Sequence, residues 1–466
     1  MPTFYIEQFG CRATQADAAA IERQLLDRGL TSASDRAAAD VVVVNTCTVT
    51  AAADSQARDS IRKIHAQNSA AQVIVTGCYA QRAPEELAAL PGVSWVIGNS
   101  HKPQIAQLAA GLQSQNHYDS PANDFVPAAA LDADSLALLH GPAKILTGDI
   151  FAQSDFLSAP VLGGEANHTR PTLKIQDGCN SRCSYCVVPF VRGKSRSLPP
   201  DKVIEEIQRL SASGYREIVL SGINLGTYGR DLSPRAEFID LLRRILDETS
   251  IERVRISSIE PLDVTEDLIA LLASTERIAQ HFHMPLQSGS DRILAAMLRW
   301  YRAEHYARRV ELIREHLPHA AIGADVIAGF PGEAQEDHEA TMAFIERLPF
   351  TYLHVFSYSK RPGTRAAALP NQVPADVIKQ RARELRALGE AKAAEFRQLQ
   401  IGRTLRVLTL RRDEDGAPNA TPALSSNYLQ IRVTGQFAAN HWLGVQISTQ
   451  VSAKNGTCLQ GVPVIA

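Results

Sequence analysis

The chain has 466 residues, 45% of them hydrophobic, so it can bury large cores and is long enough for about three domains. Its formal net charge of -2 excludes a polybasic protein whose whole surface attracts nucleic acid, so any RNA contact must be regional. The first residues resemble no secretory signal, and no apolar run approaches the ~18 residues that a membrane span needs. We therefore expect a soluble, cytoplasmic, monomeric protein with no membrane partner.

The N-terminal region alternates strand-like and helix-like segments. Apolar strands and the helices between them are predicted, in order, at 3–9, 15–28, 40–44, 51–66 and 72–75. Near-continuous apolar strands separated by helices favour a parallel sheet that is covered on both faces. We predict an α/β domain of the flavodoxin-like kind over residues 1–105.

Residues 106–167 lose this periodicity and contain several prolines, so we predict an insert or linker there. Alternation resumes in residues 168–400. Strands are predicted near 173–175, 217–220, 254–257, 280–284, 324–328 and 352–356. Six strand-helix units predict a partial (β/α)6 barrel, related to the eightfold barrel but left open at one side. Such an opening would admit a large substrate.

Residues 401–466 change to short β-like runs, which predict a small β-barrel. This segment has six basic and three acidic residues, a balance of +3, and is therefore more basic than the whole chain. Two roles are open for it: contact with RNA phosphates, or packing alone as a cap on the barrel.

Six of the seven cysteines fall into two groups of three, which favours metal ligation over disulfides. Cys179, Cys183 and Cys186 stand in Cys-Asn-Ser-Arg-Cys-Ser-Tyr-Cys, directly after the first barrel strand. Three thiolates on one short loop can hold three irons of a [4Fe-4S] cube and leave the fourth iron open. A structural zinc site or a set of buried thiols is the alternative, but structural zinc normally has four protein ligands.

Cys11, Cys47 and Cys78 are far apart in sequence, yet each follows a predicted strand. The C-terminal ends of parallel strands share one sheet edge, so the three sulfurs can converge there. We predict a second [4Fe-4S] cluster on this auxiliary triplet. Three small buried hydrophobic residues are the alternative.

Cys179, Cys183 and Cys186, with Tyr185 before the last of them, resemble the cysteine motif of the radical S-adenosylmethionine (SAM) superfamily, and we therefore call them the radical triplet. This resemblance implies that SAM binds at the open iron and that its reductive cleavage yields a 5′-deoxyadenosyl radical. Two triplets, a barrel and a β-rich tail together resemble the methylthiotransferases over nearly the whole chain except about 103–167. The family resemblance implies an auxiliary cluster for sulfur delivery and a tail similar to the TRAM module, which contacts RNA.

Four short sequence segments are more similar to the threonylcarbamoyladenosine tRNA branch of this family than to its isopentenyladenosine or ribosomal-protein branches. They are Phe9-Gly10-Cys11-Arg12, Asn45-Thr46-Cys47-Thr48-Val49-Thr50, Gly77-Cys78-Tyr79-Ala80-Gln81 and Lys174-Ile175-Gln176-Asp177-Gly178-Cys179. One departure is Ala13-Thr14-Gln15, where the family usually has an asparagine before the glutamine.

Four segments at expected strand ends resemble the sequences with which the superfamily contacts its cofactor: 221–224, 257–261, 285–290 and 329–333. On this resemblance we predict that SAM is bound by Tyr185, Gly222, Asn224, Ser258, Glu260 and Gln287. Each could instead be an ordinary turn or core position. His281 and His283 are expected to be core or supporting histidines.

Arg192, Lys194 and Arg196 follow the radical triplet and are predicted to contact tRNA phosphates or a substrate carboxylate; a solvated basic loop is the alternative. The sequence thus predicts an enzyme that methylthiolates C2 of N6-threonylcarbamoyladenosine at position 37, next to the tRNA anticodon. A reductant such as flavodoxin or ferredoxin is implied. The alternatives are isopentenyladenosine tRNA or a ribosomal protein as substrate, or a non-catalytic iron-sulfur protein that binds RNA or senses redox state.

Overall fold

The computed structural model describes residues 2–112, 143–153, 157, 159–160, 169–411, 419–453 and 456–464. The chain forms two compact units. The N-terminal unit comprises Met1–Ala159 and Val187–Lys194, and the C-terminal unit comprises Pro160–Cys186 and Ser195–Ala466. Most of the predicted insert, residues 113–142, 154–156, 158 and 161–167, lies outside the described residues, and the bounds of the four predicted segments stay predictions.

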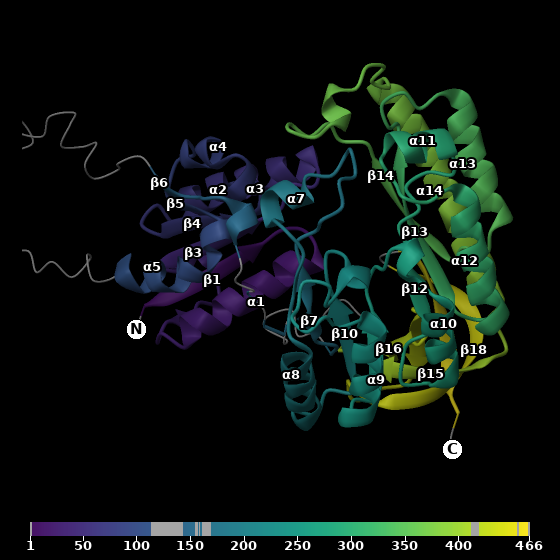
Figure 1. The fold of residues 1–466 in the computed structure, drawn as a ribbon. Helices are drawn as coiled ribbons and strands as arrows, with labels where there is room; N and C mark the ends of the chain where they lie inside the picture. The colour runs from purple at the N-terminus through teal and green to yellow at the C-terminus, as the bar shows by residue number, and fades with distance from the viewer. Residues whose placement is uncertain are drawn as a thin grey trace, which may run out of the picture. The chain divides into compact units, whose positions relative to one another are not determined.

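The N-terminal unit is a six-stranded parallel sheet in the order β2-β1-β3-β4-β5-β6 (Figure 1, purple to blue). Its first five strands follow the flavodoxin-like order, which confirms the predicted class. The strands are β1 (Thr3–Gln8), β2 (Thr31–Ser32), β3 (Val41–Thr46), β4 (Gln72–Gly77), β5 (Val93–Gly98) and β6 (Lys144–Leu146). The sixth strand comes from the segment that we predicted to be an insert.

Helices cover both faces of this sheet because successive residues of a strand point to opposite sides. Val41 and Val43 pack with α1 (Arg12–Leu26) and α5 (Ile105–Leu112). Val42 and Val44 pack on the other face, against the helices that follow β3 and β4. These are α2 (Ala51–Gln67), α3 (Cys78–Arg82) and α4 (Pro84–Ala88). A short helix that follows the radical triplet, α7 (Val188–Arg192), also belongs to this unit.

Six parallel strands form the barrel of the C-terminal unit as two three-stranded sheets, β11-β10-β7 and β12-β13-β14. Parallel bridges from Val254 to Ile278 and from Ser258 to His283 join the two sheets. The strands are β7 (Thr172–Lys174), β10 (Glu217–Ser221), β11 (Arg253–Ile256), β12 (His281–His283), β13 (Ala321–Ala328) and β14 (Tyr352–Ser357). The predicted partial (β/α)6 barrel is confirmed.

An apolar core between the strands and the surrounding helices holds this barrel together. The helices are α8 (Pro200–Ala212), α9 (Phe238–Glu248), α10 (Glu266–Ser274), α11 (Asp291–Ala296), α12 (Ala303–His316), α13 (Gln335–Arg347) and α14 (Ala375–Gln398). A two-stranded hairpin of β8 (Gln176–Asp177) and β9 (Arg196–Ser197) flanks the radical triplet in the sequence. In the described residues, no helix combines the length and the apolar character that a membrane span requires.

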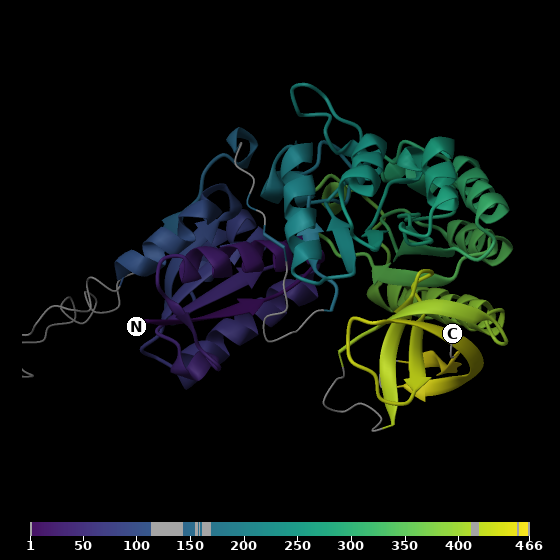
Figure 2. The same cartoon turned by 90° about the horizontal axis from the view of Figure 1, so that it is seen from below.

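The C-terminal module is a closed five-stranded barrel, as predicted (Figure 2, yellow). Its strands are β15 (Thr404–Thr409), β16 (Ala420–Ser425), β17 (Gln430–Thr434), β18 (Trp442–Ala453) and β19 (Gly456–Pro463). The end of β16 and the turn that follows it pack on the N-terminal ends of the (β/α)6 strands. Arg255 donates to the carbonyl oxygens of Ser425 and Ser426 at 2.9 Å each, and Arg253 donates to that of Leu424 at 3.1 Å.

Candidate active site

The loop that carries the radical triplet is shaped by Gln176, which lies in β8. Its amide nitrogen donates to the carbonyl oxygens of Asp177 and Gly178 and to Ser195 Oγ, and its amide oxygen accepts from the backbone of Asn224 at 2.8 Å. Gly222 follows β10, and a Cβ added to it would lie 3.0 Å from Gln176, so the absence of a side chain lets the two residues pack closely. Gln176 therefore connects the cysteine loop to the predicted cofactor-contacting end of β10.

Arg299 binds the same loop from the turn after α11. Its Nη1 donates to Cys183 Sγ at 3.4 Å, and its Nη2 forms an ion pair with the carboxylate of Glu260. Burial raises the pKa of the Cys183 thiol, against the opposing effect of the guanidinium. Because a metal displaces thiol protons, cluster binding there would release protons. We did not single out Arg299 from the sequence, since nothing local marks it as a neighbour of a loop 116 residues away.

The donor set of this loop fits an iron-sulfur cluster and a polar cofactor. The three sulfurs come from half-buried residues, and Cys186 donates its backbone N–H to Cys183 O at 3.0 Å in a tight turn. Among the described residues, Asn224 Oδ1 and Ser257 Oγ are buried without a hydrogen-bond partner. Because a buried polar atom without a partner costs free energy, such atoms indicate a missing polar group.

The remaining predicted cofactor residues lie at the same ends of the barrel strands. Asn224 Nδ2 lies 4.0 Å from Cys179 Sγ. Ser258 follows β11 and is half-buried, while Gln287 follows β12 with φ of 67°, a conformation that is uncommon for a residue with a side chain. Tyr185 packs against Phe330 and Met297, and burial raises its pKa well above the usual range. Their contact with SAM stays a prediction.

The auxiliary triplet follows three neighbouring strands, β1, β3 and β4. A Cβ added to Gly10, which has φ of 101°, would lie 2.8 Å from Cys47 Sγ, so this glycine makes room for the thiol. Burial, and then the neighbouring thiols of Cys78 and Cys11, raise the pKa of Cys47 to about 12. The three sulfurs are therefore close enough to interact, as a shared cluster requires. Thr14, at the departure from the family text, donates to Cys11 O at 2.6 Å.

The structure does not support the predicted phosphate contact of Arg192. Its side chain is only 3% exposed and pairs with Asp17 at 3.0 Å, where Lys102 also binds at 2.8 Å. From the sequence, a basic residue in such a loop was expected to contact phosphate, but Arg192 lies in helix α7 and is buried there. Against the effect of burial, the charge of Arg192 also lowers the pKa of Cys47, which favours the thiolate that a cluster needs. Lys194 is exposed and Arg196 is half-buried, and their predicted role is untested by these contacts.

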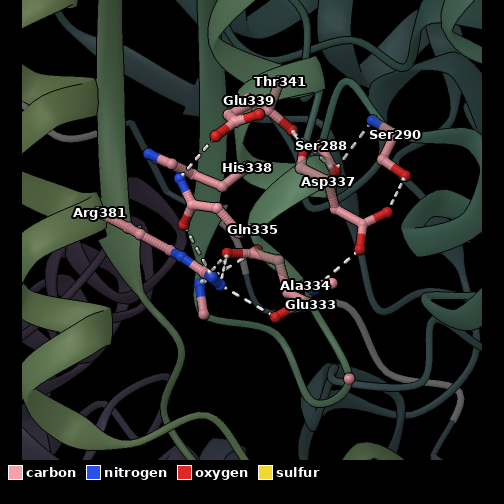
Figure 3. Close-up of polar contacts among 12 residues, drawn as sticks. Ser288, Ser290, Glu333, Ala334, Gln335, Asp337, His338, Glu339, Thr341 and Arg381 are labelled. Carbon is pink, nitrogen blue, oxygen red and sulfur yellow. Dashed lines mark hydrogen bonds and ion pairs between the residues drawn. The ribbon is translucent and has the colours of Figure 1, made fainter.

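Two of the matched segments, 285–290 and 329–333, are held by their own polar contacts (Figure 3). Glu333 accepts hydrogen bonds from the backbone N–H of Gly329 and from Arg381, which donates at 2.7 Å. Ser290 donates to Asp337 at 2.7 Å and begins helix α11. These contacts hold the two loops in place, and contact of either segment with SAM stays a prediction.

A histidine cluster lies on one face of β12, β13 and β14. His283 Nε2 lies 2.9 Å from Asp325 and its Nδ1 lies 2.9 Å from Tyr352, whose hydroxyl is also 2.7 Å from His281. His354 Nδ1 lies 3.3 Å from the same carboxylate. Although burial opposes it, hydrogen bonds from the two histidines hold the pKa of Asp325 well below its usual range. His281 and His283 are thus part of a polar network and not of an apolar core.

Comparison with known families agrees with this geometry. A family model described as "Uncharacterized protein family UPF0004" matches residues 3–98, and the Radical SAM superfamily model matches residues 173–345. The radical SAM methyltransferase TsrM from Kitasatospora setae superposes with a TM-score of 0.54 over 79% of this chain and 77% of its own, at 17% identity. This likeness concerns the fold alone. The barrel and its cysteine loop define a radical SAM enzyme.

Curated relatives narrow the class. The chain is 35% identical to the threonylcarbamoyladenosine tRNA methylthiotransferase MtaB of Aquifex aeolicus, over 92% of this chain and 96% of that protein. It is 34% identical to MtaB of Bacillus subtilis, over 93% and 91%. It is 36% identical to the tRNA-2-methylthio-N(6)-dimethylallyladenosine synthase of Syntrophobacter fumaroxidans, over 82% and 79%. The chain belongs to the radical SAM methylthiotransferase family.

Proposed function

We propose that this enzyme methylthiolates C2 of N6-threonylcarbamoyladenosine at position 37 of tRNA, with two [4Fe-4S] clusters and SAM as cofactors. The observation that carries the proposal is the 35% identity to a threonylcarbamoyladenosine tRNA methylthiotransferase over almost the full length of both chains. The two cysteine triplets, each gathered at the strand ends of its own unit, support it independently.

The chemistry explains why such cofactors are needed. The C2–H of adenine is neither acidic nor readily displaced, so acid-base groups of a protein cannot activate it. When bound, a cluster with an open iron and SAM supply the one-electron chemistry for this step. The protein's own task is to hold, orient and shield the reactants.

Individual residues are assigned as follows. The six cysteines of the two triplets ligate the clusters, and Gln176 and Arg299 fix the loop of the radical triplet. Asn224, with its buried amide oxygen, and Glu260, paired to Arg299, are the strongest of the six predicted cofactor contacts. Lys194 and Arg196 keep their proposed substrate contact.

The finer partners also belong to this proposal. The target base lies in the anticodon loop, because unpaired loop bases are the part of RNA that a protein can unstack and read. We further propose a cytoplasmic monomer that receives electrons from a flavodoxin or ferredoxin.

Dimethylallyladenosine tRNA is the second candidate substrate. The identity to the Syntrophobacter fumaroxidans synthase is similar in value but covers 82% of this chain, against 92% for the first relative. The broader coverage favours the threonylcarbamoyl substrate. A ribosomal-protein substrate and a non-catalytic role are less favoured, since the three relatives named above are enzymes that act on tRNA.

Mass spectrometry of tRNA nucleosides tests the substrate. A strain that lacks this protein should lose the methylthio form of threonylcarbamoyladenosine and keep threonylcarbamoyladenosine without the methylthio group. Complementation with the wild-type gene should restore it, while the gene with alanines at the radical triplet should not. Loss of a methylthio derivative of dimethylallyladenosine instead would assign the enzyme to the second candidate.

A further inference from the structure

An exposed tryptophan lies beside the radical triplet. Trp300 is 79% exposed, more than any other large hydrophobic side chain of the described residues. Single exposed hydrophobic residues are common and need no explanation by themselves. The position of this one matters, because it directly follows Arg299, the residue that contacts Cys183 and Glu260.

The turn that presents Trp300 is fixed to the loop of the radical triplet. Ser184 donates its backbone N–H to Met297 O at 3.0 Å and its hydroxyl to Ala296 O at 2.8 Å. Leu298 adopts φ of 58°, which reverses the chain after α11. Arg299 then points inward to the cysteine loop.

Tyr301 anchors the other side of the turn. Its hydroxyl lies 2.6 Å from Pro285 O and 3.0 Å from Leu286 O, and the residue is only 4% exposed. Trp300 therefore stands between two inward-facing, hydrogen-bonded neighbours and is itself left in solvent. Trp442, by contrast, is stacked by two guanidinium groups and donates its indole N–H to Glu252.

The chemistry of this surface fits an unpaired nucleobase. Indole rings stack on bases of any sequence, and stacking on an aromatic side chain is how proteins hold the splayed bases of RNA loops. An exposed arginine, Arg302, lies two residues after Trp300, and such a cation complements a phosphate.

We propose that Trp300 is a stacking platform for an unpaired base of the tRNA anticodon loop, a neighbour of the adenine that enters the active site. This inference rests on the proposed tRNA substrate. Stacking of the neighbouring base holds the loop open while the target adenine is unstacked.

Binding of a defined RNA tests the platform. The probe is an anticodon stem-loop with N6-threonylcarbamoyladenosine at position 37 and the fluorescent base 2-aminopurine in a neighbouring loop position. The protein is the anaerobic holoenzyme with both clusters. Trp300→Ala should weaken binding about 5- to 100-fold and relieve the quenching of 2-aminopurine. Trp300→Phe, which keeps a ring, should retain most of both.

Control variants separate stacking from other contacts. Leu399→Ala removes another strongly exposed side chain, 65% exposed at the end of α14, and should leave RNA affinity unchanged. Trp300→Leu should bind as weakly as the alanine variant. Iron content and the cluster's electron paramagnetic resonance spectrum establish that each variant is folded.

Three results would overturn the inference. If Trp300→Ala bound the stem-loop with wild-type affinity, Trp300 would not be a stacking platform. Wild-type affinity in Trp300→Leu would indicate an apolar contact and not stacking. A wild-type enzyme that binds the stem-loop in neither modified nor unmodified form would overturn the tRNA assignment itself, and the two failures are thus distinguishable.

Discussion

Replacing Glu217 with glutamine should loosen the C-terminal module from the (β/α)6 barrel. The Glu217 side chain is fully buried and pairs with Arg253 at 2.5 Å and with Arg255 at 2.9 Å. The same two arginines donate to the end of β16 and to the turn that follows it in the module. Without the carboxylate, two buried guanidinium groups lose the anion that neutralises them.

The size of the effect follows from the pKa of this carboxyl. Burial alone would raise it, but Arg255, Arg253 and Arg170 together lower it from 4.5 to about 2. A shift of this size corresponds to about 3 kcal/mol in favour of the ionised form. Removal of one partner from a buried ion pair costs about 3 to 5 kcal/mol. Both routes predict a loss of about 3 kcal/mol in Glu217→Gln.

Hydrogen exchange followed by mass spectrometry measures this loss locally, because amide exchange reports the free energy of local opening. If the module opens as one piece, about 3 kcal/mol corresponds to exchange on the order of 100-fold faster. Peptides from β16 and β17 should show the change, while peptides from α1 and β3 should not.

A matched control keeps the substitution the same and changes only the burial. Glu248 is 40% exposed and pairs with Arg244 on the surface of α9, so Glu248→Gln should change exchange by less than about five-fold. Equal exchange of the β16–β17 peptides in wild type and Glu217→Gln would refute the role of this ion cluster in docking the module.

Further predictions concern acid, the clusters and RNA. Because the pKa of Glu217 is lowered, this residue stabilises the docked module fully above pH 4.5 and loses that effect as the pH falls toward 2. Pepsin should therefore release the module from the wild type increasingly over this range, and from Glu217→Gln already at pH 4.5. Reconstituted protein should hold about eight irons; alanines at the radical triplet should remove one cube and all SAM cleavage, and a variant that still cleaves SAM would contradict the radical assignment. Alanines at the auxiliary triplet should preserve SAM cleavage and abolish the methylthio product, and unaffected product would exclude this cluster from sulfur delivery. The RNA role of the module is tested by Arg411→Ser, since deletion of 401–466 would expose Arg253 and Arg255. If Arg411 contacts a phosphate, this substitution should lower the slope of log affinity against log salt by about 0.7 to 0.9. An unchanged slope would exclude that contact.

The sequence determined those parts of this protein that depend on local spacing. Apolar strands alternating with helices specify parallel sheets, because each strand is buried on both faces and each helix on one. The radical triplet is a local motif, and the auxiliary triplet could be inferred because cysteines that follow parallel strands share a sheet edge. The closed β-barrel followed from short β-like runs.

The tertiary structure decided what depends on contacts between distant segments. Arg192 resembles an exposed basic residue in sequence, yet its pairing with Asp17, 175 residues away, buries it. Arg299 reaches Cys183 across 116 residues, and Glu217 meets Arg253 across 36. Charged side chains carry no periodicity that indicates burial, and only a partner supplied by the fold makes burial of a charge affordable. The same limit applies to Trp300, whose exposure depends on the inward anchoring of Arg299 and Tyr301 beside it.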